Sequence, residues 1–473
     1  MKANDEKAIA MKKNPTKLLP ACFVFCIISF SFSAWGATYY VAPPPLGKDT
    51  NAMGFTTPGA TFKHAFTVMK SGDTLIAKNG TYNQTVGEWR WSGSVMTPTS
   101  MPPNGTPSAF TTVKSESVGG AIINEAISII GISYIRVEGF KALGGVAVDG
   151  GSHHIEIKKV GAKGGIGTAR SSYILKEDVW AWGKDRYVIE NYGSHHIIDN
   201  RVIARLDDMG GTQPLPVGAI NHYLTNYSVI ANALLFDVSG TFSQPFYLLY
   251  SSRPDVGFNQ IWGVIGFNAG PLGGLFPGHA GEGGHQIHNS VVWGTTGHHG
   301  VRFSSPGPNG LFNSTVANNK GNAFDGGMDI TANNNIFYKN NGFGAPATSC
   351  HNNFFLESGS LTGCTNSDIT TTNLDIKYLP RSPIAGKGAT IEKRYSISEV
   401  NGVFVVTETD KSLWPWPYEE IIKADLCAGG ITKGLCGTPK TLTQYVWEYL
   451  GNKTPPEYLD KLPPAAPLGL VVR

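Results

Sequence analysis

Short apolar runs, each interrupted by a polar step that ends in asparagine, return along the middle of the chain from Gly119 to Phe355. β-Branched or aromatic residues follow each asparagine, and the later copies recur every 18 to 24 residues. A fixed period in this range is typical of a solenoid, in which each repeat packs on its neighbours. The copies that align best are 195–204, 227–235, 286–292, 310–316, 332–337 and 350–355.

The runs predict strands rather than helices. They hold four or five residues and are bounded by Gly and Asn, which is the pattern of short β-strands and turns. An asparagine at each bend can bond the asparagine of the next coil and satisfy amide groups that a bare turn leaves without partners. We therefore predict one long all-β domain, a parallel β-helix over residues 71–390, in which Asn200, Asn232, Asn289 and Asn313 form a line.

Residues 1–36 have the features of a signal peptide. Lys12, Lys13 and Lys17 precede an apolar run, and Ala34 to Gly36 offers small residues for cleavage. Five lysines and two acidic residues leave with this segment, so the net charge falls from +3 to zero. A neutral mature chain gives no electrostatic reason to expect nucleic acid or a membrane surface as a partner. We expect an exported monomer with no membrane span after cleavage.

Four cysteines remain in the mature chain, which suits disulfides in an exported protein. Three connectivities are possible, and Cys350–Cys364 with Cys427–Cys436 is the local one. A zinc site is the alternative, but no histidine stands at ligand spacing beside the second pair.

The segment after the leader resembles a known family. It has a Tyr39-Tyr40-Val41 strand, a short amphipathic helix over 61–69, Gly72-Asp73-Thr74-Leu75 and Gly80-Thr81-Tyr82. With the coils behind it, this order resembles the N-terminal cap and first coil of exported right-handed parallel β-helix proteins, the pectate-lyase-like superfamily. The resemblance implies a right-handed solenoid with a cap over 37–70. It leaves the reaction open, because the superfamily includes lyases, hydrolases, esterases, adhesins and tailspikes.

The C-terminal region predicts two helices, near 419–425 and 442–450, which we interpret as a C-terminal cap over 391–451. A Pro-rich tail, 452–473, follows.

Chemistry at a solenoid surface depends on register, because equivalent positions of successive coils lie about 4.8 Å apart. Aligning the coils predicts an exposed column of Lys163, Trp182, Arg205 and Asp237. Further columns hold Lys184 and Asp207, then Asp185 and Asp208, and the next strands stack Asn191, His222 and Arg302. Single charged residues on coils are more often solvated ion pairs than catalytic groups.

The mixture of cations, carboxylates and tryptophan suits a polysaccharide, because sugar rings pack on Trp and uronate carboxylates pair with Arg or Lys. For β-elimination, Lys184 or Arg205 is the candidate base, with Asp207 and His222 as further catalytic candidates. Lys163, Trp182 and Arg302 are candidates for substrate binding. Asp208 and Asp237 are candidate ligands of a Ca²⁺ ion that neutralises the substrate carboxylate.

Two classes of function follow. The first is an exported carbohydrate-active enzyme, a polysaccharide lyase acting on a uronic-acid-containing glycan. The second is a non-catalytic surface β-helix that binds glycan or serves a structural role, as adhesins do. A glycoside hydrolase is a further alternative, but its two carboxylates cannot be Asp207 and Asp208, since adjacent strand residues point to opposite faces.

Overall fold

The computed structural model describes residues 36–183, 187–206, 218–238, 247–250, 259–270, 273–276, 284–303, 306–326, 328–364, 369–370 and 388–450. Residues 1–35 of the predicted leader and the whole predicted tail, 452–473, lie outside this part of the chain. No helix of the described part is long and apolar enough to cross a bilayer.

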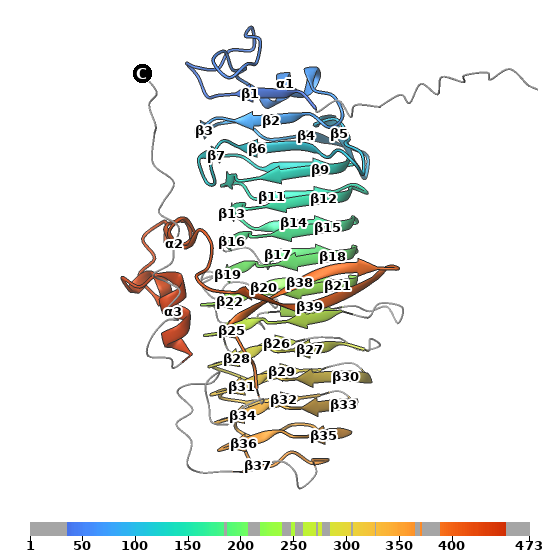
Figure 1. Cartoon of the computed structure of the whole chain (residues 1–473), viewed down its shortest axis with the longest axis vertical. Helices are drawn as coiled ribbons and strands as arrows, with labels where there is room; N and C mark the ends of the chain where they lie inside the picture. The colour runs from blue at the N-terminus through green and yellow to red at the C-terminus, as the bar shows by residue number, and fades with distance from the viewer. Residues whose placement is uncertain are drawn as a thin grey trace, which may run out of the picture. The chain divides into compact units, whose positions relative to one another are not determined.

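Three long parallel sheets make up the domain, and the chain visits them in turn, so that one pass through sheets A, B and C completes a coil (Figure 1). The fold is a right-handed parallel β-helix, as predicted. Because every strand pairs with the strands one coil before and after, residues far apart in sequence form lines across each sheet.

Sheet A consists of β1 (Thr38–Val41), β2 (Thr74–Ala77), β6 (Thr111–Ser115), β9 (Ser133–Glu138), β12 (His153–Lys158), β15 (Ser172–Glu177), β18 (His195–Asn200), β21 (Asn226–Ala231), β24 (Gln260–Trp262), β27 (Gln286–His288), β30 (Pro306–Phe312), β33 (Met328–Asn333) and β35 (Ser349–His351). Sheet B consists of β3 (Gly80–Tyr82), β7 (Ala121–Ile123), β10 (Lys141–Ala142), β13 (Gly161–Lys163), β16 (Trp180–Gly183), β19 (Ile203–Leu206), β22 (Leu234–Phe236), β25 (Ile265–Phe267), β28 (Val291–Trp293), β31 (Thr315–Ala317), β34 (Ile336–Tyr338), β36 (Phe354–Leu356) and β37 (Ile369–Thr370). Sheet C consists of β8 (Ile127–Ile130), β11 (Val146–Asp149), β14 (Ile166–Ala169), β17 (Tyr187–Tyr192), β20 (Gly218–Tyr223), β23 (Tyr247–Tyr250), β26 (Leu275–Phe276), β29 (His299–Arg302) and β32 (Asn322–Asp325).

The bend between sheets A and B is tight, and one residue in it adopts the left-handed conformation. Asn232, Asn289 and Asn313 hold this position with φ of 52°, 47° and 48°, and asparagine tolerates that conformation better than most residues. Asn200 was predicted in the same line, but it lies one residue before the left-handed position. In its coil Arg201 holds that position, with φ of 53°. The side chains still meet, because Asn232 Nδ2 donates to Asn200 Oδ1 over 2.7 Å.

A second line of polar residues lies inside the bend, one position later. Asn353 Oδ1 accepts from the Asn335 backbone N–H over 2.9 Å, Asn335 Oδ1 accepts from the Ser314 N–H over 2.9 Å, and Ser314 Oγ accepts from the Ser290 N–H over 3.1 Å. All four residues are buried. Of the predicted line, Asn232, Asn289 and Asn313 share a position and Asn232 bonds Asn200, whereas the buried ladder lies one position later and uses Asn335 and Asn353 with two serines.

Within the described coils, a cluster of charged and polar side chains lies buried in the otherwise largely apolar interior. Lys176, from β15, donates to Asp199 Oδ1 of β18 over 2.8 Å and to Asn191 Oδ1 of β17 over 2.7 Å. His222, from β20, lies 3.0 Å from Asp199 Oδ2 through Nε2 and 2.8 Å from Ser228 Oγ through Nδ1. Burial opposes charge on Asp199, but Lys176 and His222 outweigh it and lower the pKa of that carboxyl.

The predicted N-terminal helix is α1 (Phe62–Val68), and Thr61 caps it by accepting from the His64 N–H over 3.1 Å. Phe62 packs on Tyr82 and Phe140 of the first coils, with ring centroids 5.3 and 6.4 Å apart. A hairpin of β4 (Glu88–Ser92) and β5 (Val95–Ser100) leaves the coils nearby.

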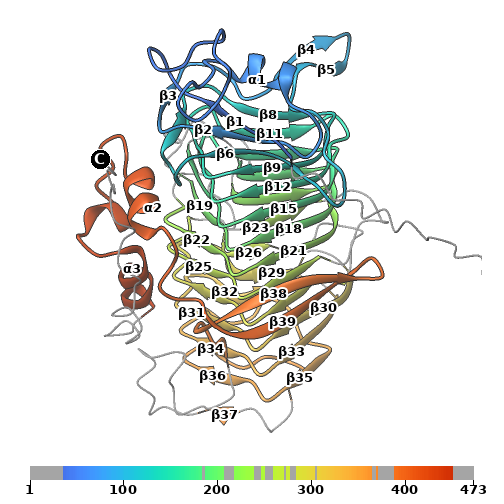
Figure 2. The ribbon, with the colours of Figure 1, turned by 45° about the horizontal axis from the view of Figure 1, so that its top comes forward.

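The C-terminal segment, residues 388–450, returns along the coils (Figure 2). Its hairpin, β38 (Lys393–Val400) and β39 (Val403–Ser412), lies on the outer face of sheet A. Helix α2 (Glu419–Leu426), the 3₁₀ turn η2 (Gly434–Gly437) and α3 (Leu442–Tyr449) follow on the outer face of sheet B.

Asparagines of the A–B bend hold this returning segment. Asn232 exchanges two hydrogen bonds with the Tyr395 backbone, over 2.9 and 2.8 Å, and Asn289 does the same with Thr390, over 2.7 and 2.6 Å. Disulfides join Cys350 to Cys364 and Cys427 to Cys436, which confirms the local pairing.

We expect Lys176→Met to lower the free energy of unfolding by about 3–5 kcal/mol, because it leaves Asp199 charged and buried without its main partner. Chemical denaturation followed by circular dichroism measures the change. The matched control is Lys176→Ile with Asp199→Ile, since Ile157 and Ile230 flank these two positions in the same line. The double variant should lose less than Lys176→Met alone, and a single variant as stable as the wild type would contradict the role of the pair.

Candidate functional site

The predicted column on sheet B is in register. Lys163 of β13 is the Cα partner of Trp182, and Trp182 is the partner of Arg205. Asp237 is not level with them, since β19 and β22 pair Ala204 with Leu235 and so place Arg205 beside Phe236. Lys163 is exposed, whereas Trp182 and Arg205 are only 2% and 4% exposed.

The C-terminal segment covers the buried part of this column. Arg205 Nη1 donates to the Leu426 carbonyl over 2.8 Å and contacts Cys436 Sγ at 2.9 Å. Asp237 accepts from the Leu435 N–H over 3.0 Å and from the Tyr445 hydroxyl over 2.9 Å. These side chains therefore anchor α2, η2 and α3. A polysaccharide cannot reach them in this arrangement, which corrects the expectation of an exposed column.

Of the remaining catalytic candidates, the structure describes only His222. His222 belongs to the buried charged cluster and has no exposed surface, so it cannot contact a substrate. Lys184, Asp207 and Asp208 lie outside the described residues. In the sequence, Lys184 directly follows Gly183, and Asp207 and Asp208 are the two residues after Leu206. Gly183 and Leu206 are Cα partners at the ends of β16 and β19.

Arg302 is exposed on sheet C, and two side chains lie near it that the alignment of the coils did not predict. Arg302 is the Cα partner of Asp325 in β32. His299, on the same strand as Arg302, also faces Asp325, with its Nε2 3.1 Å from Asp325 Oδ2. Burial lowers the pKa of His299, with Asp325 opposing and Arg302 and His298 adding to the decrease. A neutral imidazole paired with a carboxylate has the form of a general base.

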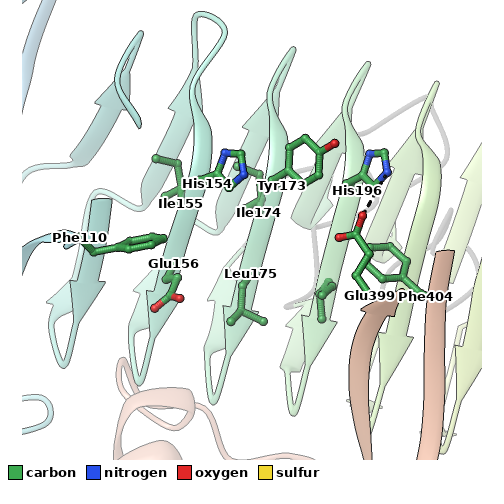
Figure 3. Close-up of a pocket in the computed structure, with 11 residues that line it drawn as sticks. Phe110, His154, Ile155, Glu156, Tyr173, Ile174, Leu175, His196, Glu399 and Phe404 are labelled. Carbon is green, nitrogen blue, oxygen red and sulfur yellow. Dashed lines mark ion pairs between the residues drawn. The ribbon is translucent and has the colours of Figure 1, made fainter. Parts of the chain in front are cut away.

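A groove of about 300 Å³ lies on the outer face of sheet A, at β12, β15 and β18 (Figure 3). His154, Tyr173 and His196 follow one another along it, from one coil to the next. The same strands also line the groove two residues further along, with Glu156, Leu175 and Ile198. Phe110 lies toward the N-terminal end of the groove, and Glu399 and Phe404 of the hairpin close the other end.

The rings along the groove belong to a longer stack, which we call the ring ladder: Tyr134, His154, Tyr173, His196 and Tyr227. Neighbouring centroids are 4.6, 4.6, 4.5 and 5.4 Å apart, with planes within 10° to 21° of parallel. Each member has a positive φ, between 49° and 57°, at the second residue of its strand, and the register on either side of this residue is unshifted. The left-handed residue turns each ring onto the outer face and into line with the next.

Because the ring faces pack on one another, the ladder presents ring edges to solvent. Those edges carry tyrosine hydroxyls and imidazole nitrogens, which donate and accept hydrogen bonds. Burial lowers the pKa of His154, His153 adds to the decrease, and Glu399 partly opposes it. Glu156 is already paired with Arg136 at 2.6 Å and Lys158 at 3.3 Å. Among the described residues that line the groove there is no lysine or arginine.

The ring ladder was not predicted from the sequence, although a signal was present. In four of the five strands a small or polar residue is followed by Tyr or His and then by Ile, as in Ser133-Tyr134-Ile135 and Ser172-Tyr173-Ile174, and the fifth begins Asn226-Tyr227-Ser228. Ordinary strand alternation assigns the first and third residues to one face. The left-handed residue between them breaks that alternation, and a period of two does not reveal it.

A metal cluster is not formed by the described residues, in which no group of three or more His, Cys, Asp or Glu side chains is arranged to hold one ion. Asp237, one of the two predicted Ca²⁺ ligands, is occupied by α3 and η2.

No protein-family model matches the sequence, and no curated protein matches it. Solved structures do match. The A-module of an Azotobacter vinelandii mannuronan C-5 epimerase is 10% identical with a TM-score of 0.48, and the match covers 64% of this chain and 91% of that one. The alginate lyase AlyGC, of family PL6, is 10% identical, with a TM-score of 0.40 and coverage of 78% and 55%. Pectate lyase Pel9A is 15% identical, with a TM-score of 0.38 and coverage of 75% and 81%. The likeness to these structures concerns the fold alone.

We expect Arg205→Met to loosen the C-terminal segment without unfolding the coils, because Leu426 loses a charge-assisted hydrogen bond in a buried place. Hydrogen exchange should become at least about tenfold faster in α2 while the strands of sheet B keep their protection. Lys163→Met, in the same column but exposed, is the control. Unchanged exchange in α2 would show that Arg205 does not anchor it.

Proposed function

We propose that this chain is an exported polysaccharide-binding protein that holds an extended glycan along the groove of sheet A. The observation that carries the proposal is the ring ladder, because it repeats hydroxyl and imidazole edges at the spacing of the coils beside an open groove. A polymer of sugars also repeats its hydroxyls, so one coil after another can offer it the same contact.

The floor and ends of the groove supply apolar surface. Leu175 and Ile198 are half-buried on the outer face, and Phe110 and Phe404 stand at the two ends. Sugar rings have apolar faces that pack on such side chains, while their hydroxyls bond to the polar edges. The combination is typical of a carbohydrate site, in which few groups are charged.

The charges in the groove favour a neutral glycan over a uronate. Glu156 and Glu399 are carboxylates, and a uronate chain brought beside them would place like charges together. The nearby cations Arg136 and Lys158 already pair with Glu156. We therefore propose neutral polysaccharides as the ligand class for this groove.

We expect Leu175→Glu to weaken glycan binding by about tenfold or more, since it places a charge on the apolar floor and narrows the groove. Titration calorimetry against soluble xylan, β-glucan, mannan, pectate and alginate measures the affinity. The fold should tolerate the change, because Glu156 occupies the neighbouring position of the same line.

Thr331→Glu is the matched control, because Thr331 lies further along the same outward line and outside the groove. Equal losses in both variants, or binding of pectate and alginate alone, would contradict the proposal.

A polysaccharide lyase is the second candidate, and His299 with Asp325 and Arg302 is the observation that favours it. In β-elimination, a base removes the proton at C5 of a uronate, a C4=C5 double bond forms as the C4–O bond breaks, and the departing oxygen takes up a proton from water. His299 has the character of the base, and Arg302 can pair with the uronate carboxylate and acidify that proton.

Elimination leaves a product that absorbs in the ultraviolet. If this candidate holds, pectate or alginate incubated with the mature chain, with and without Ca²⁺, will yield unsaturated uronates. We then expect Arg302→Met to lower kcat/KM at least about a hundredfold. Lys339→Met, an exposed cation elsewhere on the coils, is the control. Absence of absorbance with every uronate polymer would eliminate the lyase.

A further inference from the structure

The same five residues lead into two strands of sheet A. They are Gly151-Ser152-His153-His154-Ile155, where β12 starts at His153, and Gly193-Ser194-His195-His196-Ile197, where β18 starts at His195. Between these strands lies β15, with Ser172-Tyr173 at the positions of the two histidines. The second histidine of each pair belongs to the ring ladder. The first histidine plays no part in the groove.

The left-handed residue brings the two rings of each pair together. His154 and His196 have φ of 55°, which turns their side chains to the face that already carries His153 and His195. As a result, Nδ1 of His153 lies 2.9 Å from Nδ1 of His154, and Nδ1 of His195 lies 3.1 Å from Nδ1 of His196. The ring planes in each pair are close to perpendicular, at 82° and 78°.

Two imidazole nitrogens at this separation share either a proton or a cation. A cation at the usual metal–imidazole distance of about 2.0–2.1 Å from both would subtend an angle of roughly 90–100° at the metal. That is the angle between neighbouring ligands in square-planar or octahedral geometry, and it is smaller than the tetrahedral angle of zinc sites. Square-planar and tetragonal nitrogen sites are typical of Cu(II) and Ni(II).

We propose that each histidine pair is a surface site for a divalent transition metal of the Cu(II) or Ni(II) type. The protein supplies two Nδ1 ligands to each ion, and water fills the other positions, in keeping with the absence of larger ligand groups among the described residues. Hard cations such as Ca²⁺ and Mg²⁺ prefer oxygen and should not compete. Each site shares its second histidine, His154 or His196, with the groove of the proposed glycan binding, whereas the first histidine, His153 or His195, does not line that groove.

The two sites differ in one respect. His196 Nε2 lies 3.7 Å from Glu399 Oε1 of the hairpin. When His196 binds a metal through Nδ1, its proton is on Nε2 and faces this carboxylate. A carboxylate behind a ligating histidine orients the ring and makes it a stronger ligand. The pair on β18 should therefore bind more tightly than the pair on β12.

Calorimetric titration of the untagged mature chain with CuCl₂ and NiCl₂ tests the stoichiometry. We expect two equivalents for the wild type, one each for His153→Ser and for His195→Asn, and none for the double variant. These substitutions respect the fold, since Ser133 and Ser172 flank His153 in its line and Asn226 flanks His195. His351→Ala, at an exposed histidine outside the pairs, should leave two equivalents.

Electron paramagnetic resonance of the Cu(II)-loaded chain tests the placement. The two ions should lie about 10 Å apart, which is two coil spacings, and broaden each other's signals. The broadening should vanish in either single variant. Glu399→Gln should weaken the tighter site several-fold and leave the other unchanged, whereas a merely structural histidine pair would show no dependence on Glu399.

Two outcomes would overturn the proposal. If the double variant binds as much Cu(II) as the wild type, the metal is bound elsewhere. If the wild type binds no more tightly than free imidazole at the same concentration, the pairs are hydrogen-bonded rings only. Neither outcome bears on glycan affinity, which is measured in metal-free buffer with EDTA, so failure of the metal site and failure of the glycan proposal can be told apart.

Discussion

Backbone hydrogen bonds between successive coils keep equivalent residues of a sheet in one line, and every site on this protein consists of such lines. In sheet A the inward line runs through Val137, Ile157, Lys176, Asp199 and Ile230. The left-handed second residues of five of these strands form another line, the ring ladder. A slip of one residue in any coil would exchange inward and outward side chains, so the register must be fixed at each turn. The left-handed bend and the buried Ser–Asn ladder inside it perform that task, because each is bonded to its counterpart in the next coil.

The returning C-terminal segment determines which surface is available. It fills the outer face of sheet B around Trp182 and Arg205 and crosses part of sheet A, where Phe404 packs near Val229 and Ala231. It thereby removes one polar column from solvent. At the same time its hairpin forms an end wall of the sheet A groove and brings Glu399 close to His196. A single segment thus both hides the site that the alignment favoured and shapes the one that remains.

The buried cluster around Lys176 contains His222, which the sequence predicted as a catalytic residue at the surface. His222 stands in one line of sheet C with Thr168 and Asn191, and its type is that of a catalytic group. Its neighbours in space, Asp199 and Ser228, satisfy both ring nitrogens inside the coils. Such a cluster is costly to assemble because each ion loses its hydration, and it is stable only as a complete network.

The sequence by itself determined the fold class, the period of the coils, the N-terminal helix and the local disulfides, because these depend on neighbours within one or two coils. It also placed Lys163, Trp182 and Arg205 in one column, since that requires only the register of adjacent strands. Tertiary structure alone decided that Arg205 meets Leu426, a partner 221 residues away. The ring ladder falls between the two, because its residues are visible in the sequence but their common face is set by a left-handed backbone residue in each strand. Local periodicity encodes which residues share a coil face, whereas what covers that face depends on contacts between segments that no repeat connects.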